Sequence, residues 1–537
     1  MGLRLVDNLL MARDYRPVVR DQEFLLAPNM ADWLADDHLV WFVLDVVEQL
    51  DTSALHAGRR TGGVGRAGYD PDMLLALMIY AYATGQRSSR RIERLCADHV
   101  AYRVVCAQDP PDHTTIARFR AGHDEVFTDL FAQVLRLCSQ AGMVRVGSIA
   151  IDGTKIAANA SKSANRSQQW VAEHARRLAE EAVSEAAAVD AAEDAAEQAA
   201  GGPAADPPAK LRTRAGRAAA IKEAMEEIAR QDAEHADADA ADAARQEQYL
   251  QRIEAGETVA GTAPAGVDQV RLYRAKIARE QQRLAPLLDV RGTAEARQRS
   301  AIRRNITKAE AALERAEADQ VAGLADRRGS AARQRVYEQA RRGTGGPLVN
   351  LTDPQARLMV EGSGGGSVQG YNSQIACSDD HLVIAVHVSQ DANDKHCLTP
   401  TLAAATTQVA PLGKTIGLVL ADNGYFTEAN LTSTTPERLI APGRGREVHH
   451  DAKHHPTQGP PPPELSPTDA MRHKLRDPDH AKRYKRRSAT VEPIIGQLKD
   501  RIGLRRFARR GLTAVTAELH LAAAALNITR LHHATTW

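Results

Sequence analysis

Three acidic residues of this chain stand where the surrounding sequence gives no local reason for an acid. Asp152 interrupts the β-rich run IAIDGTKIA, Asp422 follows the apolar run GLVLA, and Glu492 lies in a helical stretch crowded with cations. A carboxylate that folding buries costs several kcal/mol unless it is paired or binds a metal. If the three acids converge, a divalent cation must offset their repulsion, and hard oxygen ligands suit Mg²⁺ or Mn²⁺. Two such ions about 4 Å apart can activate a water or hydroxyl and stabilise the leaving oxygen of a phosphodiester.

Each of these acids also has a simpler explanation. Asp152 in Asp-Gly and Asp422 in Asp-Asn-Gly could both form turns. Glu492 could form a salt bridge with Arg487 or Arg505. The residue patterns alone leave a metal site and these structural roles open.

Other candidate sites are weaker. Asp391 and Asp394, in SQDANDKH after a predicted strand, could offer a carboxylate in place of Asp422. The histidines at 449–450 and 454–455 lie in a Pro-rich stretch without fixed geometry, so a metal site there is not favoured.

Charge is distributed unevenly along the chain, although the formal net charge is only +1. Residues 471–510 contain 14 Lys or Arg and 4 Asp or Glu. A cationic region of this kind is what a nucleic-acid backbone requires. The 537 residues suggest about three to five structural units. The apolar content of 43% excludes wholesale disorder.

The sequence favours a cytoplasmic protein with no membrane partner. Its apolar runs, such as LLALMIYAYA at 74–83, fall short of the ~20 residues that a spanning helix needs. No signal-peptide pattern is seen. The five cysteines are widely spaced without a CxxC pair, so neither a zinc knuckle nor a disulfide framework is expected.

Residues 1–145 are expected to form a helical domain that binds DNA. Asp70 followed by Pro71 is typical of a helix start. After a Pro-Pro loop, Thr114 or Thr115 could cap one further long helix.

That further helix carries Arg118 and Arg120 in its first turns and completes a helix, turn and helix. Such an arrangement can place a helix in a DNA groove. The alternative is an ordinary helical bundle whose basic face is solvated.

A first core strand is expected within 146–162, followed by a long helical insertion at 163–345. The insertion is rich in Ala and charged residues, which favour helix. Its first arm, 171–245, has 17 acidic and 9 basic residues, and its second, 271–345, has 9 acidic and 18 basic residues. The arms could pair as hairpins or a coiled coil, or the basic arm could touch nucleic acid. Helix breaks are expected at Gly201–Pro203, Pro207–Pro208, Gly256–Gly266 and Pro286.

The chain returns to α/β character at 346–442. A His- and Pro-rich loop and linker is expected at 443–480, and basic helices at 481–537. The expected core strands are 149–157, 367–377, 381–389, 415–421 and 437–441.

Several segments, taken in order, resemble the DDE transposases of bacterial insertion sequences. The core segments are IDGTKI (151–156), LADNGYF (420–426) and YKRRSATVEPIIGQLKDRIGLRRF (484–507). The last of them resembles the family's Tyr-Arg-Glu-Lys signature, at Tyr484, Arg487, Glu492 and Lys499. Four residues separate Arg487 from Glu492, whereas the commonest form of the signature has three. Residues 68–93 and 111–120 resemble the family's N-terminal helical region.

The resemblance implies an α/β fold with a ribonuclease H-like mixed sheet as its catalytic core. Asp152 on the first strand, Asp422 at the end of the fourth and Glu492 on a C-terminal helix would be the catalytic acids. They would bind Mg²⁺ or Mn²⁺, with two ions expected.

The same resemblance implies which residues contact DNA. Tyr484, Arg487 and Lys499 would hold the scissile strand and its phosphates. Arg505 and Arg506 would add backbone contacts, which position DNA without reading its sequence. Recognition of the terminal repeats is expected in the N-terminal helices.

The implied function is that of an insertion-sequence transposase. It would bind terminal inverted repeats, cleave the 3′ ends in a metal-dependent reaction and join them to target DNA, as at least a homodimer. The alternatives are a metal-dependent nuclease of the same fold without strand transfer, and a non-catalytic or decayed DNA-binding protein.

Overall fold

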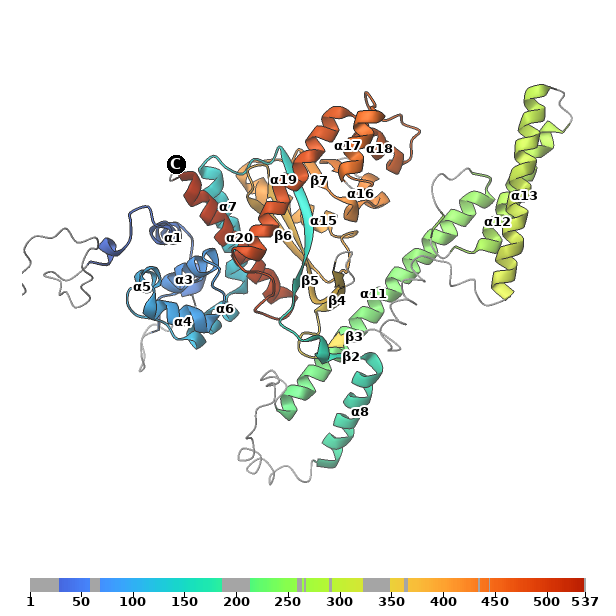
Figure 1. Ribbon diagram of the computed structural model, residues 1–537. Coiled ribbons are helices and arrows are strands. Elements are labelled where there is room, and N and C mark those ends of the chain that lie inside the picture. Colours follow the sequence, from blue (N-terminus) through green and yellow to red (C-terminus); the bar gives the residue numbers. More distant parts are fainter. Residues whose placement is uncertain are drawn as a thin grey trace, which may run out of the picture.

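The architecture is mixed α/β, as expected. The computed structural model has a mixed β-sheet packed between helices, with a block of helices on one side and a long helical arm on the other (Figure 1). The described residues are 29–57, 68–185, 213–257, 263–264, 267–288, 292–321, 348–361, 366–432, 435–443 and 445–535.

The sheet is organised around two long antiparallel strands, β1 (Ser148–Ala157) and β5 (Gly366–Ser378). On the free side of β1 lies β7 (Leu418–Ala421), which runs parallel to it. Strand β8 (Glu437–Ile440) is in turn parallel to β7. The two parallel strands are thus short, and β7 joins them to the long central pair.

Two further strands, β4 (Arg357–Glu361) and β6 (Val383–Ser389), pair with β5 on its other side. The strand order is β4-β5-β1-β7-β8, with β6 also on β5. All five predicted core strands are present, and β4 is an addition. The expected insertion does lie between the first strand, β1, and the second predicted core strand, β5.

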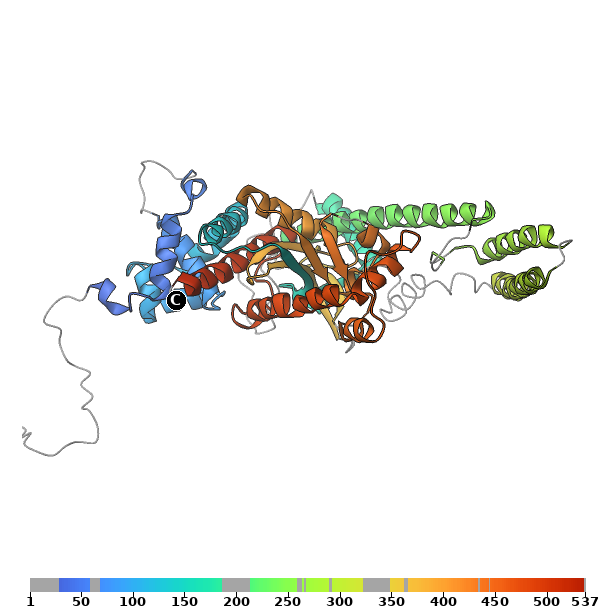
Figure 2. The same cartoon turned by 90° about the horizontal axis from the view of Figure 1, so that it is seen from above.

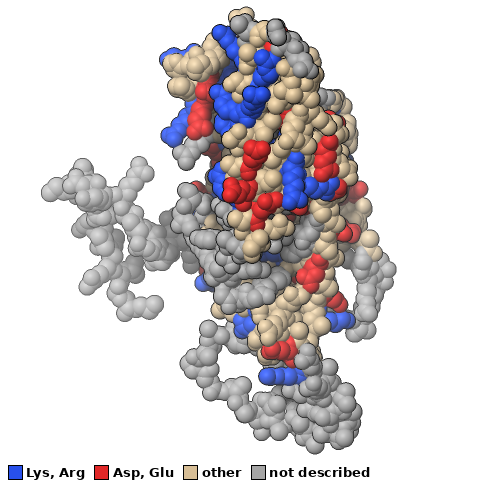
Figure 3. Space-filling model, turned by 90° about the vertical axis from the view of Figure 1, so that its right-hand side faces the viewer, with Lys and Arg blue, Asp and Glu red and all other residues tan. Residues whose placement is uncertain are grey.

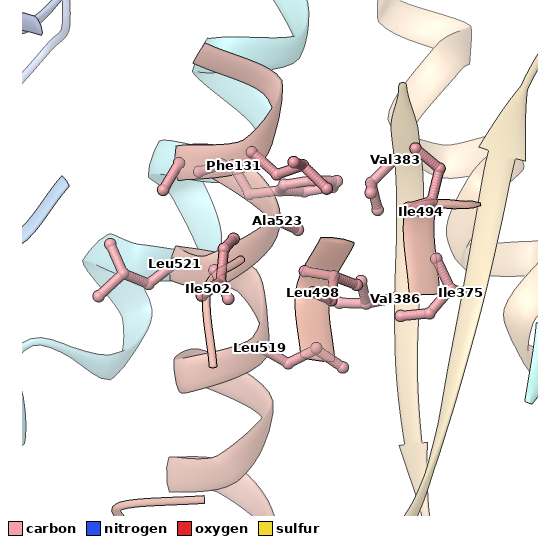
Figure 4. Close-up of a cluster of buried hydrophobic side chains, with 14 of the residues drawn as sticks. Phe131, Ile375, Val383, Val386, Ile494, Leu498, Ile502, Leu519, Leu521 and Ala523 are labelled. Carbon is pink, nitrogen blue, oxygen red and sulfur yellow. The ribbon is translucent and has the colours of Figure 1, made fainter. Parts of the chain in front are cut away.

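One face of the sheet is covered by α19 (Pro478–Asp500) and α20 (Leu512–Thr535), and α7 (Asp124–Gln140) packs on α20. Helix α15 (Leu398–Val409) packs on β5 and β6, on the opposite side from α19 (Figure 2). Figure 4 shows the first face, where apolar side chains of three helices and two strands meet: Phe131, Ile375, Val383, Val386, Ile494, Leu498, Ile502, Leu519, Leu521 and Ala523.

Helix α20 is long and apolar enough to cross a membrane by length and composition alone. However, 78% of its apolar window is buried inside the protein, against α7, α3 and β6. Its apolar surface is therefore used by the core. All five cysteines are buried and unpaired, so no disulfide links these elements.

The described residues of the N-terminal region, 29–57 and 68–145, are mainly helical, as predicted. Helix α3 (Pro71–Ala83) begins at Asp70, whose side chain accepts a hydrogen bond from the Asp72 backbone N–H. The other elements are a 3₁₀ turn (Met30–Trp33), α1 (Leu39–Glu48), α2 (Ser53–His56), α4 (Ser89–Asp98) and α5 (Val100–Val105).

The predicted long helix that follows the Pro-Pro loop was wrong in two details. It is two helices, α6 (His113–Gly122) and α7, separated at His123. Asp112 caps α6 rather than a threonine, because its Oδ1 accepts hydrogen bonds from two successive backbone N–H groups.

The described part of the insertion is mostly helical. It contains α8 (Gln168–Glu185), α11 (Arg214–Glu254), α12 (Gln269–Leu284) and α13 (Thr293–Val321). Helix α11 runs away from the sheet and carries α12 and α13 at its far end (Figures 1 and 2). At its base, β2 (Asn165–Ser167) pairs with β3 (Leu348–Asn350).

Oppositely charged side chains link the helices of this arm. Arg271 at the start of α12 pairs with Glu247 and Glu254 on α11, and Arg274 pairs with Glu317 on α13. Figure 3, which faces the end of the arm, shows Lys and Arg interspersed with Asp and Glu. The predicted breaks near Gly256 and Pro286 are present, and those at 201–203 and 207–208 lie outside the described residues.

The stretch 443–480 is not the loop that its Pro and His content suggested. It contains α17 (Gly445–His454) and α18 (Pro467–Arg476), which pack on each other and on α19. Each helix buries two residues four apart, Val448 with Ala452 and Met471 with Leu475, which is one face of a helix. The Pro cluster lies between them. A short helix, α16 (Glu428–Thr432), follows β7.

Candidate active site

Two of the three predicted acids are carried by neighbouring parallel strands. Ala150 of β1 is level with Leu420 of β7. Asp152 and Asp422 each stand two residues further along, so their side chains lie at the same level and point to the same side of the sheet. The sheet thus brings these two acids together although 269 positions separate them in the sequence.

The turn explanation for Asp422 is also correct. Its carboxylate accepts a hydrogen bond of 2.9 Å from the Gly424 N–H and caps a 3₁₀ turn, Asn423–Tyr425. A single cap uses one lone pair of the carboxylate, and the remaining lone pairs can still bind a cation. The structural role and the predicted functional role are therefore compatible.

Glu492 approaches this pair from α19, which packs across β1 and β5. Arg487, on the same helix, links the two parts of the site. Its Nη1 lies 3.1 Å from Oδ2 of Asp152, and its Nη2 lies 3.5 Å from Oε1 of Glu492. Arg487 thus belongs to the site despite its shifted spacing in the signature, because a long side chain spans the extra residue.

The three acids do not form a finished cation cage. Among the described residues, one group of three potential ligands lies within 4.8 Å, and it consists of His56, Asp70 and Asp72. That group is a helix cap with an adjoining ion pair. At the candidate site, the guanidinium of Arg487 lies among the acids, and Nη1 is buried without a well-aligned acceptor.

Burial disfavours the ionised form of the two aspartates. It raises the pKa of Asp152 to about 6, against the charge of Arg487 and together with that of Asp422. It also raises the pKa of Asp422, again against Arg487, while Asp394 adds to the rise. Raised pKa values mean that the neighbouring charges do not fully offset the cost of burying these carboxylates in their ionised form.

Asp394 was a weak candidate in the sequence, but it lies beside this pair. It follows β6, and its Oδ1 accepts hydrogen bonds from Asn372 and Gln374 of β5. The hydroxyl of Tyr425, just after Asp422, donates to the Gln374 side chain. We call Asn372, Gln374, Asp394 and Tyr425, which lie beside the acids, the polar floor. Only the local spacing in SQDANDKH hinted at Asp394, and sequence gave no sign of Asn372 or Gln374.

A cavity of about 560 Å³ opens beside Asp422 and Glu492. Tyr484 lines it and is otherwise buried, and burial raises the pKa of Tyr484 to about 12. The lining residues come from the turn after β7, from α17 and from α19: Asp422, Asn423, Gly443, Gly445, Arg446, His449, Tyr484, Lys485, Arg487, Ser488 and Glu492. Helix α17, which the sequence did not predict, is one wall of this cavity.

Most cations near the cavity already have an acidic partner. Arg483 pairs with Glu437, and Arg486 lies 3.1 Å from Asp379. Within the part of the chain that the structure describes, no ion pair involves Arg446 or Lys485. These two side chains are therefore available to an anion in the cavity.

The other predicted DNA-contacting residues lie around the site or apart from it. Arg505 and Arg506 are exposed just beyond α19, where Arg505 pairs with Asp500. Lys499 is half-buried, two turns after Glu492 on α19. None of these three lines the cavity.

Arg118 and Arg120 lie on α6, in the separate N-terminal block (Figure 1). Arg118 is exposed, whereas Arg120 is half-buried and donates a hydrogen bond to the backbone carbonyl of Arg87. Arg87 in turn pairs with Glu518 of α20. Arg120 therefore helps to join the N-terminal helices to the core.

Two family models match the chain. A transposase domain, DUF772, matches residues 28–122, and a transposase DDE domain matches residues 462–532. The two matches support an insertion-sequence DDE transposase. This confirms the resemblance drawn from the sequence. The second match includes Glu492, whereas Asp152 and Asp422 lie outside both matched ranges. Neither curated proteins nor solved structures match the chain.

Proposed function

We propose that this transposase binds the terminal inverted repeats of its own element, cleaves their 3′ ends and joins them to target DNA. Asp152, Asp422 and Glu492 would be its catalytic acids. One observation carries the proposal. The register of the parallel strands places Asp152 and Asp422 side by side, and Arg487 contacts both Asp152 and Glu492. Cleavage and joining are both in-line displacements at phosphorus, so one site can serve both.

The sheet and its covering helices would be a ribonuclease H-like core. The support is the order β6-β5-β1-β7-β8, with β5 antiparallel to β1 and with β7 and β8 parallel to it. The helical insertion would act as a coiled-coil-like arm. The pairing of α12 with α13 supports that description.

Mg²⁺ or Mn²⁺, in two ions, would be held by the three acids. Two observations support the fit: the ligand atoms are hard carboxylate oxygens, and burial raises the pKa values of both aspartates. When bound, the ions would activate the attacking water or 3′-hydroxyl and stabilise the leaving oxygen. Glu492 has a 58% exposed side chain and is free to turn toward them.

The chain's own cations would hold the DNA backbone beside the acids. Arg446 and Lys485 would bind phosphates in the cavity, and Arg487 would exchange its carboxylate partner for a phosphate as the site fills. Tyr484 would pack beside the scissile strand, and Lys499 would hold a phosphate further along α19.

Contacts farther from the cavity would orient the element end. Arg505 and Arg506 would add backbone contacts, while Arg118 and Arg120 on α6 would lie in the region that recognises the repeats. Two element ends must be paired for joining, so the working complex would contain at least two copies. It would act in the cytoplasm on double-stranded DNA.

The test is cleavage and joining of DNA that carries the end of the flanking element. Wild type is compared with Asp152→Asn, Asp422→Asn and Glu492→Gln in Mg²⁺ and in Mn²⁺. We expect each substitution to abolish both reactions while a gel shift in EDTA still shows DNA binding. Activity that survives in the variants would rule out this set of acids.

The same assay separates the alternatives. A nuclease without strand transfer would cleave intact ends but would fail to join pre-cleaved ends to a target. A non-catalytic DNA-binding protein would bind the ends and cut under neither metal.

A further inference from the structure

A fourth carboxylate is built into the floor of the candidate site. Asp394 lies in the loop after β6, and its Oδ1 is 2.8 Å from Nδ2 of Asn372 and 2.7 Å from Nε2 of Gln374. Both amide side chains are buried on β5, where they are at most 1% exposed. Gln374 also accepts the hydrogen bond of the buried Tyr425 hydroxyl. Asp394 is thus held against β5 by two fully buried partners.

The same carboxylate lies against the backbone next to both catalytic aspartates. A Cβ at Gly153, the residue after Asp152, would overlap Oδ1 of Asp394. A Cβ at Gly424 would be 3.1 Å from Oδ2 of Asp394 and 3.0 Å from Oδ1 of Asp422. The segment after Asp152 therefore approaches Asp394 too closely for any side chain, and the segment after Asp422 leaves only tight room for one.

We propose that Asp394 is a positioning residue that fixes the separation of Asp152 and Asp422. Its Oδ1 is tied to β5, and the carboxylate fills the space between Gly153 and Gly424, so it sets how closely β1 and the turn after β7 approach. This inference rests on the proposed function, because the separation of the two aspartates matters when they bind divalent cations together.

The role assigned to Asp394 is one of shape and hydrogen bonding. Oδ1 already accepts two hydrogen bonds, and the contacts toward the acids pass through glycine backbone. Partners of this kind orient metal ligands, and removing them typically weakens metal affinity about 10–100-fold. An asparagine at 394 could still accept from Asn372 and Gln374 through its amide oxygen, whereas an alanine could not.

The experiment measures Mn²⁺ binding to the full chain without DNA, by titration calorimetry and by electron paramagnetic resonance. We expect Asp394→Ala to weaken Mn²⁺ binding about 10–100-fold and to alter the spectrum of the bound ion. Asp394→Asn should weaken Mn²⁺ binding clearly less than Asp394→Ala does. Asp391→Ala is the matched control, because Asp391 is an exposed aspartate of the same loop. Melting temperatures show that each variant is folded.

Two outcomes would overturn the inference. Equal losses in Asp394→Ala and Asp394→Asn would mean that the charge of Asp394, and not its shape, is required. Unchanged Mn²⁺ binding in both variants would mean that Asp394 does not position the acids.

A second variant keeps the test decisive if Asp394→Ala does not fold. Gly153→Ala places a methyl group against Asp394 and its partner Gln374, so it should weaken Mn²⁺ binding in a folded protein, and intact binding would contradict the inference. Failure of the proposed function is distinguishable. In that case neither wild type nor any of the variants binds Mn²⁺.

Discussion

The candidate site has two halves that differ in how firmly they are built. Asp152 and Asp422 belong to the sheet, are mostly buried and are fixed by strand register and by the polar floor. Glu492 and Arg487 belong to α19, and the Glu492 carboxylate is largely exposed. The sheet half is therefore preorganised, whereas the helix half can rearrange when cations and DNA arrive.

The two halves also differ in how the family matches cover them. The DDE-domain match, 462–532, contains the helix half, and neither match contains the aspartates. The less rigid half of the site thus carries the recognisable signature. The more rigid half is formed by pairing of strands that are far apart in the sequence, and such pairing leaves no local sequence motif.

The largest expected difference between the halves lies in metal binding without DNA. Asp152→Asn and Asp422→Asn should abolish measurable Mn²⁺ binding, because they remove the preorganised ligands. Glu492→Gln should retain Mn²⁺ binding with a loss below about tenfold, although it should still abolish cleavage. Calorimetry and a single-turnover cleavage assay measure the two effects.

If Glu492→Gln loses Mn²⁺ binding as completely as the aspartate variants, the distinction between a fixed and an adjustable half is wrong. Glu464→Gln, an exposed acid in the loop before α18, is the matched control and should change neither quantity.

Removing Arg487, which links the two halves, should have the next largest effect, and this effect is on stability. Arg487→Ala leaves Asp152 and Asp422 buried without a nearby cation, and breaking a buried pair costs about 3–5 kcal/mol. We expect the melting temperature in EDTA to fall strongly and Mg²⁺ to recover more of it than in wild type. Thermal unfolding with and without Mg²⁺ measures this.

Arg486→Ala provides the comparison for that variant. Arg486 is one residue away on the same helix and forms a more exposed pair with Asp379. Exposed pairs contribute about 0–1 kcal/mol, so this variant should melt near wild type in both conditions. Equal losses in the two variants would mean that α19, not the link to the acids, determines the stability.

The sheet half should also give folding a distinctive pH dependence. The pKa of Asp152 is raised to about 6 in the folded protein, so between about pH 4 and 6 the folded state binds a proton that the unfolded chain does not. Its contribution to stability is therefore complete below about pH 4 and is lost as the pH rises through 6. The loss amounts to about 3 kcal/mol at most.

Urea unfolding in EDTA at several pH values measures this loss. Asp152→Asn cannot titrate, so its free energy of unfolding should fall less than that of wild type between pH 4 and 7. Parallel curves for the two proteins would show that Asp152 is ionised at all these pH values.

Sequence reasoning predicted the strands and one helix start where the signal was local. The five strands were predicted from apolar runs, and the Asp70 cap from its Asp-Pro pair. The helix break at 123 and the cap at Asp112 were missed, because nearby threonines and a continuous helical pattern offered an equally good local choice.

The missed parts of the site depend on contacts between distant segments. Asn372 and Gln374 are ordinary polar residues of a strand until β6 returns and places Asp394 over them. Likewise, α17 was not predicted, because its segment is rich in His and is followed by a Pro-rich stretch. Only two apolar residues, Val448 and Ala452, mark its buried face, and they stabilise the helix only when another helix packs against them.

The smallest expected effect concerns α17, the wall of the cavity that faces α19. Arg446→Ala and Lys485→Ala should each weaken binding of element-end DNA and lower its salt dependence by about one unit of slope per residue. Arg472→Ala on α18 is the matched control, because Arg472 already pairs with Asp469 and lies outside the cavity. Fluorescence anisotropy from 50 to 200 mM salt resolves such slopes. A change of slope for Lys485 alone would confine DNA to the α19 side, whereas equal changes for both residues would mean that DNA enters between the two helices.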